Sequence, residues 1–196
     1  DMKLKINGKT TDIVGNGKYI KVDRMWKDGD LMELVLPMEI QVKQWAANKN
    51  SVSINRGPLT YALKIKENYI QKDSKQSAIG DSKWQETADP SKWPSFEILP
   101  QSDWNYGLVP EQLTDLKQLK VVKKAWPKDG FPFEAHAVPI SILVKAKIIP
   151  EWKIDAHGLT AVLPLSPVST ETKIQEVELI PMGAARLRIA AFPTVK

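Results

Sequence analysis

The feature that most constrains the fold is a two-residue alternation of apolar and mixed side chains over residues 32–42 and 138–148. This spacing predicts half-buried β-strands, because successive side chains of a strand point to opposite faces. Pro37 cannot donate a ladder hydrogen bond, so the first strand is expected at a sheet edge or bent there. The apolar positions are Met32, Leu34, Leu36, Met38, Ile40 and Val42, then Val138, Ile140, Ile142, Val144, Ala146 and Ile148.

Turn signals separate these runs from several shorter ones. They include Asn7–Gly8, Arg56–Gly57, Asp129–Gly130 and His157–Gly158, and such dipeptides favour tight connections between strands. Helical signal is confined to one or two turns at residues 110–116, where Pro110 suits the first helical position. We therefore predict an all-β fold, an antiparallel β-sandwich in two sandwich-like modules with little helix.

A polar stretch at residues 67–95 suggests where the modules divide. It contains few aliphatic residues, and its large apolar side chains are Trp84 and Trp93, so it reads as a long connection. We expect a first β-sandwich module, complete or partial, at residues 1–66. A second module is expected at residues 96–196.

The charge pattern and the absence of cysteine narrow the partners. The chain carries a net charge of +5, but its lysines alternate singly with apolar residues, as on the solvent face of a strand. No motif or basic patch points to nucleic acid, and no apolar stretch is long enough for a membrane helix. With no cysteine, disulfides, thiolate metal sites and cysteine nucleophiles are excluded.

The sequence offers no complete catalytic set. His136 and His157 lie far apart and belong to no metal-binding motif, and neither a Gly-x-Ser-x-Gly elbow nor a phosphate loop is present. Glycoside hydrolysis usually uses two converging carboxylates, but Asp28 and Asp30 read as residues of a solvated turn. We expect no catalytic residue, no metal site and no cofactor.

The seven tryptophans are the residues that suggest a binding function. Aromatic rings in loops can stack on the C–H faces of sugars, or they can seal the ends of a sandwich core. The best candidate for sugar contact is the segment Trp104, Asn105 and Tyr106, which places two aromatic rings and an amide in one short loop. Core packing is the competing interpretation of the same residues.

Several phrases, taken in order, resemble one family. They lie at residues 19–30, 34–38, 54–62, 96–100, 104–108, 163–168, 178–183 and 187–193. Together they resemble the C-terminal β-sandwich region of the β-L-arabinofuranosidase-like glycoside hydrolases, family 127 and its relatives. In that family an α/α barrel carries a zinc-bound cysteine nucleophile and a glutamate acid/base. None of these residues can be transferred to a chain that has neither cysteine nor barrel.

The resemblance implies a segment of a glycoside hydrolase that is itself non-catalytic. Its expected partner is the catalytic α/α barrel of the same parent chain, which it would cover and stabilise, with a plant-type oligosaccharide as a second partner. The substrate class favours a periplasmic or secreted location. The alternatives are an independent carbohydrate-binding module using exposed Trp and Tyr residues, and a self-contained hydrolase with converging carboxylates.

Overall fold

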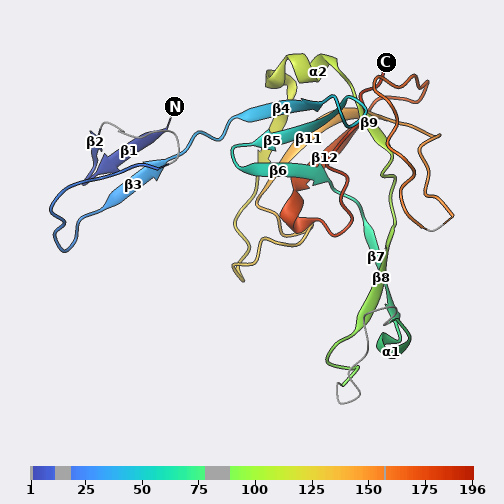
Figure 1. Ribbon diagram of the computed structural model, residues 1–196, viewed down its shortest axis with the longest axis horizontal. Helices are drawn as coiled ribbons and strands as arrows, with labels where there is room; N and C mark the ends of the chain where they lie inside the picture. Colours follow the sequence, from blue (N-terminus) through green and yellow to red (C-terminus); the bar gives the residue numbers. More distant parts are fainter. Residues whose placement is uncertain (1, 12–18, 78–88, 157) are drawn as a thin grey trace.

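The structure, a computed structural model, describes residues 2–11, 19–77, 89–156 and 158–196 of the chain. Regular structure in these ranges is almost entirely strand, and every pairing between the named strands described is antiparallel. The predicted all-β antiparallel class with little helix is confirmed. The strands form a small sheet, a large curled sheet and a hairpin (Figure 1).

The small sheet contains β1 (Lys3–Ile6), β2 (Lys9–Thr11) and β3 (Met32–Val35) in the order β2-β1-β3. Asn7 and Gly8 join β1 to β2, and both adopt positive φ angles, as the predicted tight hairpin turn requires. Leu4 lies opposite Leu34 and Ile6 opposite Met32, so these four side chains share one face. In Figure 1 this sheet stands apart from the rest of the molecule.

The first alternating run is divided between two sheets. Strand β3 ends at Val35, and β4 (Ile40–Trp45) begins five residues later in the large sheet. Pro37 lies in the connection, where its missing N–H costs no ladder hydrogen bond. The single strand expected over this run is therefore two strands, each at the edge of its sheet, with the proline between them.

The large sheet has seven strands. Six follow the order β10-β11-β12-β6-β5-β4, and β9 pairs with β11 beside this path. The second alternating run forms the long central strand β11 (Ile140–Ile148). The remaining strands are β5 (Ser51–Arg56), β6 (Leu59–Leu63), β9 (Tyr106–Leu108), β10 (Lys120–Lys123) and β12 (Gln175–Pro181).

The main core lies against this curled sheet. Ile54 and Tyr61 contribute from β5 and β6, and Ile142 and Leu179 from β11 and β12, all fully buried in one cluster. The C-terminal segment closes the core, because Phe192 exchanges backbone hydrogen bonds with Val52 at 2.8 Å in both directions. Residues far apart in sequence therefore share one hydrophobic interior.

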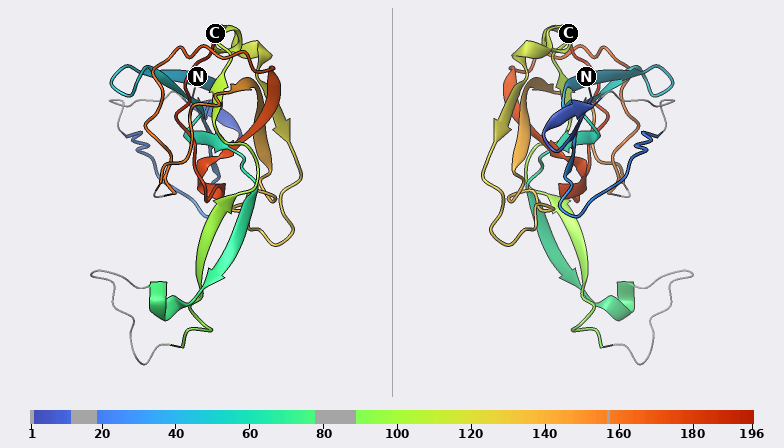
Figure 2. Two further views of the ribbon diagram at one scale, coloured as in Figure 1. Left: turned by 90° about the vertical axis from the view of Figure 1, so that its right-hand side faces the viewer. Right: turned by 90° about the vertical axis from the view of Figure 1, so that its left-hand side faces the viewer.

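The third unit is a two-stranded hairpin. Strands β7 (Glu67–Lys72) and β8 (Ser95–Pro100) pair along six positions, and the short helix α1 (Ser74–Ser77) follows β7. Figures 1 and 2 show this hairpin leaving the body as an arm. Among the described residues, no further strand pairs with the arm.

Helix is limited to single turns among the described residues. The predicted turn near Pro110 is present as α2 (Glu111–Thr114), followed by the 3₁₀ turn η1 (Leu116–Gln118). Gln112 anchors α2 to the sheet, since its side chain bonds both the N–H and the carbonyl of Lys145. The other 3₁₀ turn is η2 (Met182–Ala184). No helix in the described ranges is long and apolar enough to cross a membrane.

The large sheet takes strands from both sequence ranges expected to be modules. Strands β4 to β6 come from residues 1–66, and β9 to β12 from residues 96–196. The range expected to be a polar connection contains β7, α1 and the start of β8. Independent folding of the two ranges stays a prediction, and their shared core argues against it.

Candidate functional site

Trp104 and Tyr106, two of the residues proposed for sugar contact, are core residues. Their exposed fractions are 9% and 7%. The Trp104 ring packs edge-to-face on Trp152 with 5.1 Å between ring centroids, a geometry that aromatic pairs prefer. Trp152 is fixed in turn, because its indole N–H donates to the carbonyl of Ala161 at 3.1 Å.

Asn105 and the Tyr106 hydroxyl make internal hydrogen bonds. The Asn105 amide donates to the carbonyl of Ile149 at 2.9 Å, and the Ile149 N–H donates to the carbonyl of Asn105. The Tyr106 hydroxyl donates to Gln175 at 3.3 Å, and burial raises the pKa of that hydroxyl. These contacts favour core packing as the role of the segment.

One edge of this segment borders a surface hollow. Trp104 and Asn105 line it together with Trp152 and Ile154, and its volume is about 340 Å³. Sugar contact by Trp104, Asn105 and Tyr106 stays a prediction. In this structure such contact would involve ring edges and the amide rather than an open aromatic platform.

The other tryptophans lie mostly at the surface. Trp93 and Trp126 are well exposed, whereas Trp26 lies under the Arg24 guanidinium and Trp45 under the Lys43 ammonium. Cation–π contacts of this kind cover one face of each ring. Trp84 lies outside the described residues.

The polar residues considered for catalysis contact other groups of the protein. Asp30 accepts hydrogen bonds from Asn7, from the Lys27 N–H and from Arg24, at 2.7 to 3.0 Å. These contacts, that from Asn7 foremost, lower the pKa of Asp30. His136 lies 3.4 Å from Glu134, and His157 is outside the described residues. Among the residues that are described, no group of three or more His, Cys, Asp or Glu could hold a metal.

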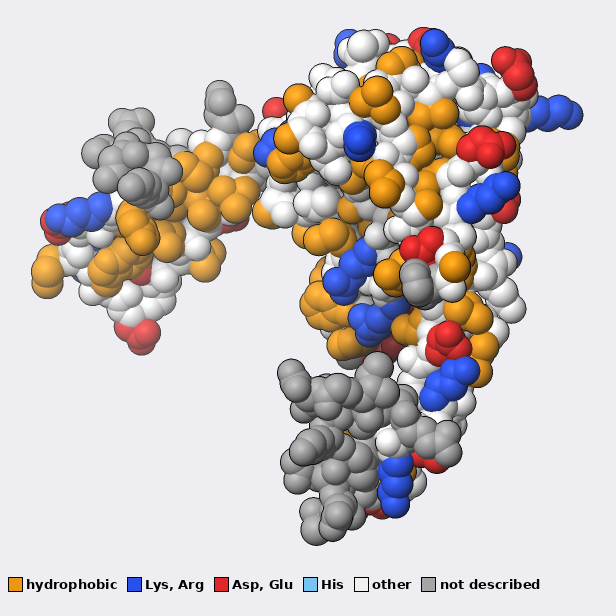
Figure 3. Space-filling model, turned by 45° about the vertical axis from the view of Figure 1, so that its right-hand side comes forward, with side chains coloured by type: hydrophobic (Ala, Val, Ile, Leu, Met, Phe, Trp, Pro, Cys, Tyr) orange, Lys and Arg blue, Asp and Glu red, His pale blue; other side chains and the backbone are white. Residues whose placement is uncertain are grey.

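The small sheet and the segment that leads into β3 present exposed apolar side chains, which together we call the apolar face. Met25, Leu31 and Met32 have exposed fractions of 87%, 66% and 51%, and Leu34 and Leu36 are similarly open. In Figure 3 apolar side chains gather over this part of the molecule. Large exposed apolar patches mark interaction surfaces, because leaving such area in water is unfavourable.

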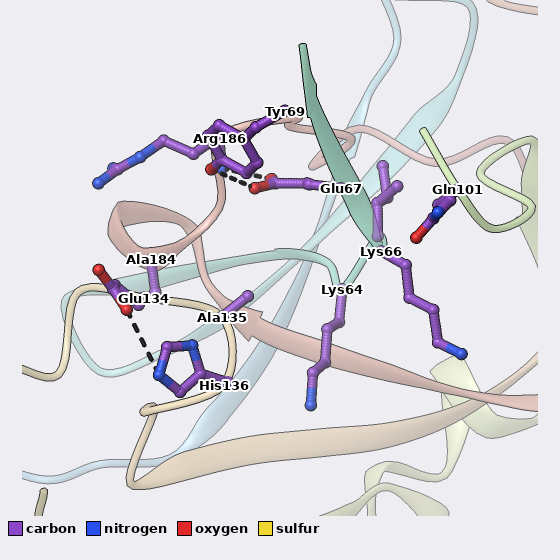
Figure 4. Close-up of a pocket in the computed structure, with 11 residues that line it drawn as sticks. Lys64, Lys66, Glu67, Tyr69, Gln101, Glu134, Ala135, His136, Ala184 and Arg186 are labelled. Atoms are coloured by element: carbon purple, nitrogen blue, oxygen red, sulfur yellow. Dashed lines mark hydrogen bonds and ion pairs between the residues drawn. The ribbon is translucent and has the colours of Figure 1, made fainter. Parts of the chain in front are cut away.

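A second feature is a cavity of about 540 Å³, which we call the Glu67 pocket (Figure 4). Its walls come from residues 64–67, Tyr69, Gln101, residues 134–136, Ala184 and Arg186. Its volume is within the range of small-molecule sites. The first hairpin strand, the loop before β11 and the turn after β12 all meet there.

Glu67 organises this pocket. One carboxylate oxygen accepts the N–H groups of Arg186 and Leu187 at 3.0 and 2.9 Å, and the other accepts the Tyr69 hydroxyl at 2.7 Å. The hydrogen bond to Glu67, with burial as the next cause, raises the pKa of that hydroxyl. Sequence reasoning missed this site because Glu67 and Arg186 are 119 positions apart, and neither belongs to a motif.

Comparison with known proteins first defines a class. The fold is similar to solved glycoside hydrolases, including one described as a GH127 beta-arabinofuranosidase and another described as a glycoside hydrolase. Both are 18% identical, with TM-scores of 0.51 and 0.52, and the likeness covers 99% and 100% of this chain. At this identity the likeness concerns the fold. The chain spans only 23% and 26% of those proteins.

Two further matches name a particular family to which the chain is similar. Residues 1–38 match the family described as beta-L-arabinofuranosidase, GH127 middle domain. The GH127 beta-L-arabinofuranosidase from Geobacillus stearothermophilus T6 is similar in fold over the whole chain, with 18% identity, a TM-score of 0.50 and 25% of its own length covered. No curated protein matches the sequence. The resemblance to a segment of the GH127 β-L-arabinofuranosidases is therefore confirmed.

Proposed function

We propose that this chain is a non-catalytic β-sheet segment that packs on the catalytic α/α barrel of a GH127-like parent chain and stabilises it. The observation that carries the proposal is the apolar face, which lies within the residues that match the GH127 middle domain. The chain spans about a quarter of its structural relatives, so a larger partner polypeptide is available in proteins of that kind.

The energetics of the apolar face support docking. Met32 and Leu34 project from β3 on the same side as Leu4 and Ile6, whereas Lys5 and Glu33 form an ion pair of 2.8 Å on the other side. Burying one Leu or Met side chain contributes about 1.5–3 kcal/mol. A partner that covers several of these residues therefore gains enough to hold the small sheet in place.

The carboxylates support a non-catalytic role. A glycosidase acid needs a raised pKa to be protonated near neutral pH. Hydrogen bonds lower the pKa of the Asp30 and Asp89 carboxylates. Burial pushes the pKa of Glu178 upward, but Lys64 and Lys124 outweigh it, so that pKa is also lowered. All three are bases held in the ionised form.

The docking proposal is tested with the parent enzyme carrying Met32→Glu and Leu34→Glu. We expect the purified variant to lose thermal stability in its barrel, because two charges would face the interface. The matched control is Leu165→Glu, which alters an equally exposed apolar residue on the body. A barrel melting temperature that is equal in the double variant, the control and the unmodified parent would contradict docking through this face.

The non-catalytic part is tested separately. The isolated chain is incubated with a chromogenic β-L-arabinofuranoside, with the parent enzyme as the positive control. We expect no turnover above the buffer rate. Enzyme-like hydrolysis that survives repeated purification would establish a self-contained hydrolase instead.

The second candidate function is an independent carbohydrate-binding module. The exposed rings of Trp93 and Trp126 favour it, since open aromatic faces stack on sugars. Calorimetric titration with plant oligosaccharides tests it. Saturable heat that is lost on Trp126→Ala would support an open platform, whereas loss on Trp104→Ala would support the segment predicted from sequence.

A further inference from the structure

We propose that the Glu67 pocket binds a neutral, hydroxyl-rich saccharide. This assignment goes beyond barrel docking and uses none of the residues of the apolar face. Its basis is a fixed frame, charges of both signs, and a wall that offers both donors and acceptors beside one aromatic ring.

The frame is held by hydrogen bonds that leave the cavity open. Glu67 ties the hairpin to residues 186–187 through two backbone N–H groups. Gln101 is fixed beside Lys66, because its N–H donates to the Lys66 carbonyl at 2.7 Å. The Lys66 N–H donates in turn to the Ser102 hydroxyl at 3.0 Å. A site held in this way loses little conformational entropy on binding.

The pocket lining carries charges of both signs. Lys64, Lys66 and Arg186 line it as cations, and Glu67 and Glu134 line it as carboxylates. Lys64 also pairs with Glu178 at 2.7 Å, just outside the lining. The lining therefore holds three cations and two carboxylates, and the charge of Lys64 is engaged by Glu178, which also pairs with Lys124 at 3.4 Å. Because charges of both signs lie at the wall, a ligand of either charge meets repulsion as well as attraction.

The hydrogen-bonding inventory suits hydroxyl groups. Lysine and arginine only donate, an ionised carboxylate only accepts, and the Gln101 amide does both. A sugar hydroxyl can donate and accept at once, so it can bridge neighbours of opposite kind. A phosphate could use the cations, but its negative charge would lie beside the carboxylates of Glu134 and Glu67.

Tyr69 supplies the apolar part of the wall. Its ring is about half exposed, and its hydroxyl is held by Glu67, so its orientation is set before a ligand arrives. Figure 4 shows Tyr69 and Glu67 at one end of the pocket, with His136 and Glu134 across from them. An aromatic face beside polar groups matches a sugar ring, which has C–H faces and a polar rim.

The test is a titration of the isolated chain followed by two-dimensional NMR. The probes are neutral arabino-oligosaccharides, with galacturonic acid and glucosamine oligomers as charged comparisons, at up to about 10 mM, because weak sites require millimolar ligand. We expect saturable shifts centred on residues 64–69, Gln101 and residues 134–136. Neutral sugars should bind at least about tenfold more tightly than either charged class.

The variants are Gln101→Ala combined with Lys66→Ala, both at exposed positions, and the control is Gln44→Ala on an exposed site of β4. The double variant should weaken binding by about tenfold or more, while the control binds like the unmodified chain. Absence of saturable shifts, a preference for a charged oligomer, or unchanged affinity in the double variant would each overturn the proposal. Binding is measured without the barrel, so its outcome is independent of docking.

Discussion

At the residue scale, Glu67 makes more structural contacts than its position in a polar stretch of sequence indicates. Its carboxylate satisfies two backbone N–H groups and one phenol from separate parts of the chain. Such contacts are costly to remove, because the partner N–H and hydroxyl groups would be left without hydrogen bonds. Glu67 is thus a latch between the hairpin and the turn after β12.

The latch predicts a difference between two substitutions. Glu67→Ala should lower the free energy of unfolding by about 1–3 kcal/mol, whereas Glu67→Gln, which keeps a carbonyl oxygen, should lose less. Urea denaturation followed by circular dichroism measures both. The control is Glu97→Ala, whose exposed ion pair with Lys72 should contribute at most about 1 kcal/mol. Equal losses in Glu67→Ala and Glu97→Ala would contradict the latch.

Gly107, beside the predicted sugar segment, is required by close packing. A Cβ at this position would press on the side chains of Val195 and Ile149, and overpacked cores typically lose about 1–3 kcal/mol. We expect Gly107→Ala to lower the melting temperature clearly. Gly183→Ala, where a Cβ would meet no neighbour within 4 Å, should leave it nearly unchanged. A stable Gly107→Ala variant would contradict the packing described for β9.

Glu178 predicts a pH dependence of stability. Its pKa is lowered in the folded chain, since Lys64 and Lys124 outweigh the effect of burial. A lowered folded pKa gives stability that is present above the unfolded value of 4.5 and is lost as pH falls through the folded pKa. Glu178→Gln should therefore flatten the loss of stability below about pH 4.5. Parallel acid-unfolding curves for variant and parent chain would contradict this role.

At the element scale, part of the fold could be predicted from sequence and part could not. The alternation at residues 138–148 corresponds to β11, and Pro37 marks the break between β3 and β4, because both are local signals. The pairing of β6 with β12 joins Leu63 to Leu179, and no local pattern encodes it. The burial of Trp104 depends on its contact with Trp152. Composition alone therefore could not decide whether Trp104 contacts a sugar or packs in the core.

The shared sheet predicts which fragments fold. Residues 39–196 keep all seven strands of the large sheet and should give a cooperative thermal transition. Residues 96–196 lack Ile54, Tyr61 and Leu63, which belong to the main core, and should remain unfolded. Proton NMR dispersion of the two purified fragments checks this. A well-dispersed spectrum from residues 96–196 would restore the division at residues 67–95.

At the scale of the whole molecule, three units of different character are joined. The body has its own buried core, while the small sheet keeps the apolar face open and the hairpin arm stands as a two-stranded unit (Figures 1 and 3). A two-stranded hairpin has marginal stability by itself in water. Both outer units therefore gain from contact with a partner, and for the small sheet this contact is the central claim of the proposed function.

Methionine oxidation tests this claim most directly, because Met25 and Met32 lie on the apolar face and Met182 lies on the body. The isolated chain and the full parent enzyme are treated with a dilute peroxide pulse, and sulfoxide formation is followed by mass spectrometry. Burial in the parent should slow oxidation of Met25 and Met32 by about tenfold or more while Met182 reacts at similar rates in both. Equal rates for Met25 and Met32 in both proteins would contradict docking through this face.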